Sequence, residues 1–142
     1  AGANEAANYF APSESNLARA AVRGMAVPGK QIRIGFVNAT LMQNGINPWD
    51  LPFRARGFTD LGTDGIIVSV EEFDARRILG VTAHEVGHTL GLPHPSSNSW
   101  KRWLMRGDGG DEIIWDNKPS DSKRFQSGDF EIIRNSIFYV PH

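Results

Sequence analysis

The pattern of apolar and polar residues in the first half of the chain predicts one helix and two strands. Apolar residues recur with helical spacing over 13–25, and Ser13 is a residue type that often caps a helix N-terminus. Apolar residues alternate with others over 31–37, and residues 65–71 are rich in β-branched side chains, so both stretches are expected to be strands. Prolines and glycines are frequent in 43–64, where we expect a long irregular connection.

The second half of the chain shows a helical pattern over residues 75–90, then a loop-rich stretch, then a last helix that begins near Ser127. On the first of these helices, the apolar residues expected to face the core are Leu79, Ala83, Val86 and Leu90. On the last helix they are Phe130, Ile133 and Ile137.

Three of the four histidines lie in one stretch, His-Glu-Val-Gly-His-Thr-Leu-Gly-Leu-Pro-His, at 84–94. His84 and His88 are four residues apart, so on a helix both side chains can reach a single metal ion. Gly91 can adopt a positive φ and end the helix, and the returning chain then brings His94 toward the other two histidines. Three protein ligands with an open fourth position are typical of a catalytic zinc site, since structural zinc usually has four.

Glu85 lies next to the first histidine, where its carboxylate can take a proton from a metal-bound water. The residues therefore predict a zinc hydrolase with one catalytic Zn²⁺. The alternative, that these are ordinary histidines of an amphipathic helix, leaves one helix face carrying histidines and an acid with no partner to explain them.

The motif resembles that of the metzincin clan of zinc metallopeptidases, and its wording is closest to the matrixins, the matrix-metalloproteinase-like branch. The clan has a tight turn with a methionine below the metal, and Met105 follows His94 at about the right interval. The resemblance implies a zinc-dependent endopeptidase in which His84, His88 and His94 hold the metal. In this family the acid of the motif, here Glu85, activates the zinc-bound water.

The resemblance also implies an α+β fold of the zincin kind. This fold has a small twisted mixed sheet with an active-site helix, a backing helix, and a loop-rich C-terminal part ending in a helix. We expect residues 1–142 to form a single catalytic domain. Matrixins hold a second, structural zinc through further histidines. His142 is the one histidine left in this chain, so we expect that second site to be missing.

Metzincins bind an extended substrate as an additional strand, on the edge strand that precedes the active-site helix. If the match holds, Ile67, Val68 and Ser69 would bind the peptide backbone, although a plain core strand explains the same residues. The segment after the methionine turn forms a wall of the specificity pocket in this clan. Its apolar candidates here are Ile113, Ile114 and Trp115.

Composition narrows the partners that the chain can have. The net charge of −1 argues against nucleic acid or an anionic membrane, which bind basic surfaces. No apolar run approaches the ~18 residues of a membrane helix. The absence of cysteine excludes disulfides within these residues. The family resemblance implies that the partner is a protein or peptide substrate and that the enzyme is secreted and extracellular, and we expect a monomer.

Clustered acids could chelate calcium, although solvated loop acids are the commoner explanation. The acids concerned are Asp60 and Asp64 in one group and Asp108, Asp111 and Glu112 in another.

Two other classes stay open. In gluzincins a distant glutamate is the third zinc ligand, and Glu112 could serve in that role, which would leave His94 spare. A non-catalytic zinc-stabilised binding module would also need the histidines, but it would have no use for the general base Glu85. The sequence does not identify the physiological substrate or the side chain preferred next to the cleaved bond.

Overall fold

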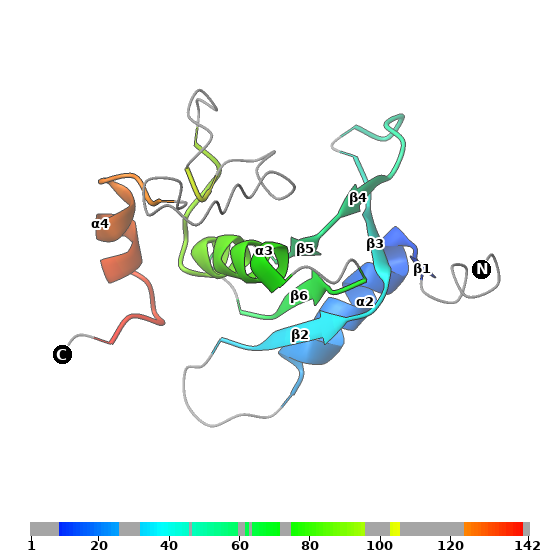
Figure 1. Cartoon of the computed structure of the whole chain (residues 1–142), viewed down its shortest axis with the longest axis horizontal. Coiled ribbons are helices and arrows are strands. Elements are labelled where there is room, and N and C mark those ends of the chain that lie inside the picture. Colours follow the sequence, from blue (N-terminus) through cyan, green and yellow to red (C-terminus); the bar gives the residue numbers. More distant parts are fainter. Residues whose placement is uncertain are drawn as a thin grey trace.

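The computed structural model describes residues 9–25, 32–45, 47–59, 62, 64–71, 75–95, 103–105 and 124–140. Its elements, in chain order (Figure 1), are β1 (Tyr9–Phe10), α2 (Pro12–Arg23), β2 (Ile34–Val37), β3 (Thr40–Gln43), β4 (Phe53–Ala55), β5 (Gly57–Phe58), β6 (Ile66–Ser69), α3 (Ala75–Thr89) and α4 (Asp129–Arg134). In this part of the chain no helix has the length and apolar character needed to cross a membrane.

The strands form two small sheets, and the chain runs directly from one sheet to the other at two places. One sheet has the order β1-β3-β4 and the other the order β2-β6-β5. Strand β2 pairs with β6 in parallel, and β5 pairs with β6 antiparallel. The chain passes between the sheets at residues 38–39, between β2 and β3, and again at Arg56, between β4 and β5. The predicted α+β class with small mixed sheets is confirmed.

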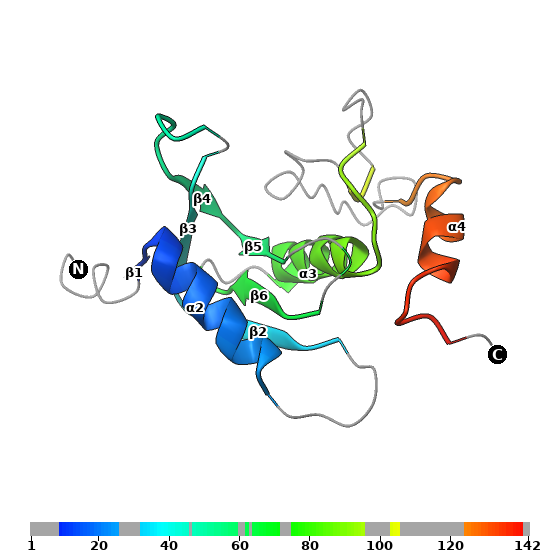
Figure 2. The same ribbon diagram turned by 180° about the vertical axis from the view of Figure 1, so that it is seen from behind.

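Strand β6 lies between the two long helices, with α2 on one face and α3 on the other (Figure 2). Successive side chains of a strand point to opposite faces, and β6 is apolar on both. Ile67 packs with Leu41 and Phe58, in a cluster that includes residues of α2. Ile66 and Val68 pack with Val81 of α3 and its neighbours, in a second cluster. The predicted strand is confirmed, but the prediction that it lies at the sheet edge was wrong.

Helix α2 begins earlier than its sequence pattern suggested, because its N-cap lies two residues before Ser13. Ala11 is the N-cap and Pro12 takes the first helical position, where its missing N–H costs no hydrogen bond. The side chain of Glu14 reaches back to accept a hydrogen bond from the Ala11 amide at 3.4 Å. Ser13 therefore lies inside the helix, and its predicted role as the cap was wrong.

Three further predictions about apolar residues and connections need correction. Residues 43–64 are not wholly irregular, because they contain β4 and β5. Leu79 of α3 is 62% exposed, and the helix instead packs through Ile78, Val81 and Val86. On and beyond α4, Phe130 and Ile137 are exposed rather than buried, and none of the helix's six residues is buried.

Candidate metal centre and catalytic cleft

Helix α3 presents His84 and His88 on one face, and each ring is fixed through its Nδ1 atom. His84 Nδ1 lies 2.6 Å from the carbonyl oxygen of Leu104, and His88 Nδ1 lies 2.7 Å from that of Leu92. A carbonyl oxygen can only accept a hydrogen bond, so both Nδ1 atoms carry the proton. Each Nε2 is then left with an unprotonated lone pair, which is the tautomer that a metal ion needs.

The turn after α3 brings the third histidine to the same point. Gly91 has φ = 99°, as its predicted role in ending the helix requires. The Gly91 amide donates to the His88 carbonyl and the Leu92 amide to the Gly87 carbonyl, both at 2.9 Å. Leu92 is fully buried, which fixes the exit direction of the chain. His94 is thereby returned toward α3.

The three Nε2 atoms converge. His94 Nε2 lies 3.0 Å from His88 Nε2 and 3.3 Å from His84 Nε2. Two nitrogens on a tetrahedral zinc ion, each about 2.05 Å from the metal, are separated by about 3.3 Å. Three imidazole nitrogens that all carry lone pairs repel one another at this distance, and a cation between them removes that repulsion. The donor set and its spacing therefore fit a zinc ion held by His84, His88 and His94.

Burial keeps two of the three histidines, His88 and His94, neutral and able to bind a metal ion. Burial lowers the pKa of His94. Burial also lowers the pKa of His88, where nearby His94 acts in the same direction and the hydrogen bond to Leu92 opposes it. A histidine with a lowered pKa stays unprotonated at more acidic pH, so its lone pair remains available to the metal.

Glu85 is a buried carboxyl group beside this cluster. It is 6% exposed and lines the same cavity as the three histidines. Burial raises its pKa from 4.5 to about 8, against the lowering effect of a hydrogen bond with the Thr59 backbone. A divalent cation nearby favours the ionised form. Such a carboxyl group can accept and release a proton near neutral pH.

Met105 packs against α3 at Gly87, which lies between the two helix histidines in the sequence. It is buried, and a β-carbon on Gly87 would overlap its sulfur and lie 2.9 Å from its Cε atom. The preceding residue, Leu104, supplies the carbonyl that fixes His84. The amide of Leu104 in turn donates to the Arg124 carbonyl at 2.8 Å. The turn at 103–105 therefore contributes both a support for the helix and a ring-orienting acceptor.

The cavity over the histidines has a volume of about 510 Å³. One wall consists of α3 and the histidines, and the other consists of Gln43 and residues 53–59. Ile67, Val68 and Ser69, which we predicted to bind substrate, are not part of its lining, because β6 is the central strand. Ile113, Ile114 and Trp115 lie outside the described residues, as do Asp60, Asp108, Asp111 and Glu112.

Sequence reasoning missed the opposite wall, residues 53–59. The order Phe-Arg-Ala-Arg-Gly-Phe at 53–58 alternates apolar or small residues with arginine, which is the period of a strand with one face buried. Glycines and prolines on either side of this stretch led us to predict an irregular connection instead of strands. The alternation over 53–57 could have identified β4.

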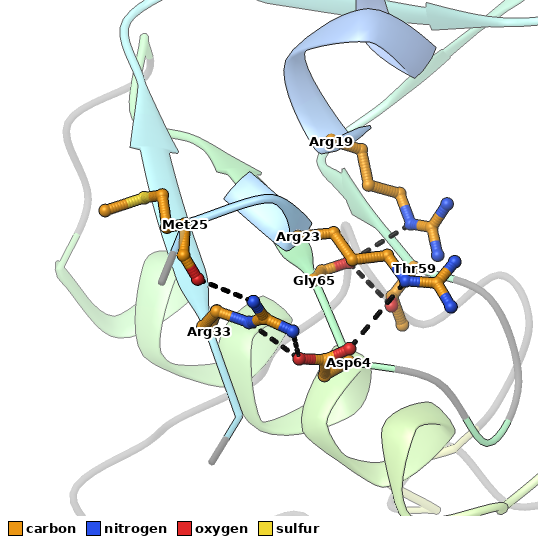
Figure 3. A network of polar contacts seen from close by, with 7 residues as sticks. All are labelled: Arg19, Arg23, Met25, Arg33, Thr59, Asp64 and Gly65. Atoms are coloured by element: carbon orange, nitrogen blue, oxygen red, sulfur yellow. Dashed lines mark hydrogen bonds and ion pairs between the residues drawn. The ribbon is translucent and has the colours of Figure 1, made fainter. Parts of the chain in front are cut away.

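Asp64 and Gly65 anchor the chain between β5 and β6 (Figure 3). Arg33 donates to the Asp64 carboxylate through Nε, at 2.7 Å, and through Nη2. The Gly65 carbonyl accepts from Arg19 Nε at 3.1 Å and from Thr59 Oγ1 at 2.9 Å. The carboxylate of Asp64 is thus engaged by arginine, which argues against the calcium role considered for it.

This anchored segment reaches the candidate metal centre at two points. The Thr59 backbone hydrogen-bonds the Glu85 carboxyl group. The Gly62 amide donates to the carbonyl of His88 at 2.8 Å. The contacts of Asp64 and Gly65 therefore hold a segment that touches both the buried acid and one of the converging histidines.

A second cavity, of about 390 Å³, shares His94 with the first. Its other walls include Trp103 and Met105 of the methionine turn and Ile132 of α4. Pro93 and Pro95 complete an apolar side next to the histidine. A large apolar group placed beside the metal centre would fit this cavity.

Comparison with solved structures shows that the fold is shared with archaemetzincins. The crystal structure of archaemetzincin from Methanopyrus kandleri matches with a TM-score of 0.60 at 19% sequence identity, over 87% of this chain. The archaemetzincin from Archaeoglobus fulgidus, solved in complex with malonate, matches with a TM-score of 0.52 at 20% identity, over 82% of this chain. The matrixin branch suggested by the motif is not supported by these matches.

The aligned regions make up 64% of the Methanopyrus kandleri chain and 68% of the Archaeoglobus fulgidus chain. No protein-family model and no curated protein sequence matches this chain.

Proposed function

We propose that this chain is a zinc-dependent peptidase that cleaves peptide bonds within polypeptide chains. The observation that carries the proposal is the convergence of three histidine Nε2 atoms, two of them freed for a metal by hydrogen bonds at Nδ1. The buried acid Glu85 in the same cavity gives this donor set a general base. The archaemetzincin fold supports the same conclusion.

A zinc ion bound here would supply a Lewis acid that polarises the scissile carbonyl and makes water acidic enough to act as a nucleophile near neutral pH. Glu85 accepts the proton that the attacking water loses, and then delivers it to the departing amine. The carbonyls of Leu104 and Leu92 keep two of the histidine rings oriented throughout. No covalent intermediate with the protein is required.

We place the substrate against β5 rather than against β6. Strand β5 is at the edge of its sheet and its residues line the cavity, so a peptide could add to it as a further strand. The second cavity, beside His94, would receive a side chain next to the cleaved bond. Secretion and a monomeric state stay predictions.

The test combines elemental analysis for zinc with cleavage of a mixed peptide library by the wild type and by Glu85→Gln. We expect one zinc ion per chain in both proteins and cleavage by the wild type alone. Zinc without cleavage by the wild type would favour a zinc-stabilised binding module. A wild type that binds no zinc would overturn the proposal.

A matched pair of variants separates the two candidate third ligands. Replacement His94→Ala should lower zinc affinity by more than about 100-fold, because the loss of a direct ligand exceeds that of a supporting hydrogen bond. Replacement Glu112→Ala should leave zinc affinity unchanged. The reverse result would indicate the gluzincin arrangement.

A further inference from the structure

The turn between β3 and β4 displays large apolar side chains to solvent. Trp49 is 80% exposed and Leu51 is 86% exposed, and Phe53, at the start of β4, is 49% exposed. Single exposed apolar residues are common on protein surfaces, but three within five positions of one turn form a local patch. We call residues 47–53 the apolar tip. In Figure 1 the hairpin that carries it projects away from the body of the molecule.

The apolar tip is held in one shape by its own contacts. The Asn47 amide donates to the Asp50 carboxylate at 3.1 Å, and the Asp50 amide donates to the Asn47 carbonyl at 3.0 Å. Gly45 lies so close that a β-carbon there would overlap Asp50. Pro48 and Pro52 fix φ on either side. The exposed side chains are therefore presented by an ordered turn, which reduces the entropy lost when a partner binds.

The apolar tip is continuous with the wall of the catalytic cleft. Gln43 pairs with Phe53 at the end of the hairpin, and both residues line the 510 Å³ cavity. The same wall then runs through β4 and β5 to Phe58 and Thr59. Five residue steps from Phe58 to Phe53 cover roughly 17 Å. A chain bound along this wall reaches the apolar tip about five residues from the histidines.

We propose that the apolar tip is an exosite for the extended part of a polypeptide substrate. Apolar side chains of the substrate, about five or more residues from the bond that is cleaved, pack against Trp49 and Leu51. This inference rests on the proposed peptidase function and deepens it, because it assigns the substrate class. The substrates are unfolded or extended polypeptides that carry an apolar cluster at that distance, rather than short peptides.

The position and charge of the apolar tip favour a polypeptide over other occupants. A cavity of 510 Å³ is in the size range of sites for drug-sized ligands, so a polypeptide bound there must extend beyond it. The apolar tip carries one formal charge, on Asp50, and Arg54 beside it is paired with Glu71. It therefore lacks the basic residues with which a protein surface usually approaches an anionic membrane.

The test measures binding and cleavage of two fluorescent peptides with the same central sequence. The sequence is the one that zinc-loaded Glu85→Gln retains most strongly from a peptide library. One peptide has four residues, and the other extends it by six residues on each side, with leucine or phenylalanine at the outer positions. The variant is Trp49→Ser/Leu51→Ser. The control is Leu17→Ser on α2, which is 70% exposed and lies outside the cavity lining.

We expect the variant to bind the long peptide roughly tenfold more weakly than the wild type, because buried apolar area is lost. Its binding of the short peptide and its kcat should be unchanged, and Leu17→Ser should match the wild type. Equal affinity of the variant and the wild type for the long peptide would overturn the exosite. The exosite would also be overturned if the wild type formed a dimer in sedimentation, or bound phosphatidylcholine vesicles, and the variant did not. Binding that depends on the apolar tip without any cleavage would overturn the peptidase function instead.

Discussion

Met105 packs so closely against Gly87 of α3 that a methyl group at that position would fit only if the methionine side chain moved. Gly87 lies between His84 and His88 in the sequence. The contact therefore sets the distance between the methionine turn and the part of α3 that carries both rings. A glycine in a helix interior costs stability relative to alanine. The close packing of the methionine turn against α3 explains why a glycine occupies this helix position.

Replacement Gly87→Ala should destabilise the protein by up to about 2 kcal/mol, because moving the buried Met105 thioether costs about 1–3 kcal/mol and the better helix propensity of alanine returns about 1 kcal/mol. Zinc affinity should fall as well, since Leu104 next to Met105 orients His84. Urea unfolding and a competitive zinc titration measure the two effects.

The double variant Gly87→Ala/Met105→Ala is the decisive control for this contact. Met105→Ala alone leaves a cavity, at a cost of about 2–5 kcal/mol, and the added alanine methyl would partly fill it. The double variant should therefore lose less stability than the sum of the losses in the two single variants. Additive effects would show that the two side chains do not compete for the same space.

The metal-ligand residues could be predicted from the sequence because their geometry is local. The spacing from His84 to His88 is set by one helical turn, and Gly91 allows the turn that returns His94. The substrate wall could not be predicted in the same way. The position of β6 between β2 and β5 depends on pairing with β2, about thirty positions away, and with β5, across a connection that contains two glycines and two aspartates. An apolar strand such as 66–69 is compatible with either the centre or the edge of a sheet.

Amphipathic patterns also failed where packing partners are few. The helical spacing of Phe130 and Ile137 suggested a buried face, but both residues remain exposed, and Ile137 lies beyond the end of α4. On α3, Leu79 has the same spacing as core residues, yet β6 meets the helix through Val81 and its neighbours. Periodicity identifies a helix, whereas the face that becomes buried depends on the sheet it meets.

The Asp64 contacts should matter for catalysis as well as stability, because the segment they anchor touches Glu85 through Thr59. Replacement Asp64→Asn removes a half-buried ion pair with Arg33, and we expect a loss of about 1–3 kcal/mol in the free energy of unfolding. Hydrolysis per bound zinc ion should also fall, since the general base would be positioned less precisely. Zinc content should stay the same.

Arg23→Gln is the matched control for Asp64→Asn. The Arg23 Nε atom is 3.9 Å from Asp64 and its side chain is 52% exposed, so its removal should cost well under about 1 kcal/mol. Urea unfolding, zinc analysis and kcat are measured on both variants. A destabilised Asp64→Asn with normal kcat per zinc ion would limit the role of the ion pair to stability.

The cavity beside His94 should set the preferred side chain next to the cleaved bond. Replacement Ile132→Phe narrows it from α4 and should shift cleavage toward small residues at one position, with kcat/KM for a bulky residue reduced by roughly tenfold or more. The same substitution at Ile137, which is 62% exposed and not in the cavity lining, should leave the preference unchanged. Library profiling that shows no difference between the two variants would assign the specificity to other residues.

The buried carboxyl group of Glu85 should make the stability of the metal-free protein depend on pH. Burial raises its pKa from 4.5 to about 8 in the folded protein, whereas the unfolded chain keeps the ordinary value. Between these two pH values the folded state holds a proton that the unfolded chain has released, so this group's contribution is complete below pH 4.5 and is lost as the pH rises through about 8. At about 1.4 kcal/mol per pKa unit, the loss amounts to at most about 5 kcal/mol.

Comparison of the wild type with Glu85→Gln isolates this effect. His88 and His94, whose pKa values are lowered, act in the opposite direction, since their contribution is lost as the pH falls; both proteins contain them. In urea unfolding with a chelator at pH 5, 6, 7 and 8, the glutamine variant should gain stability relative to the wild type at each step. A difference that does not change with pH would mean that Glu85 ionises at its ordinary pKa. It would then lack the proton affinity near neutrality that a base needs to hold a proton between its two transfers.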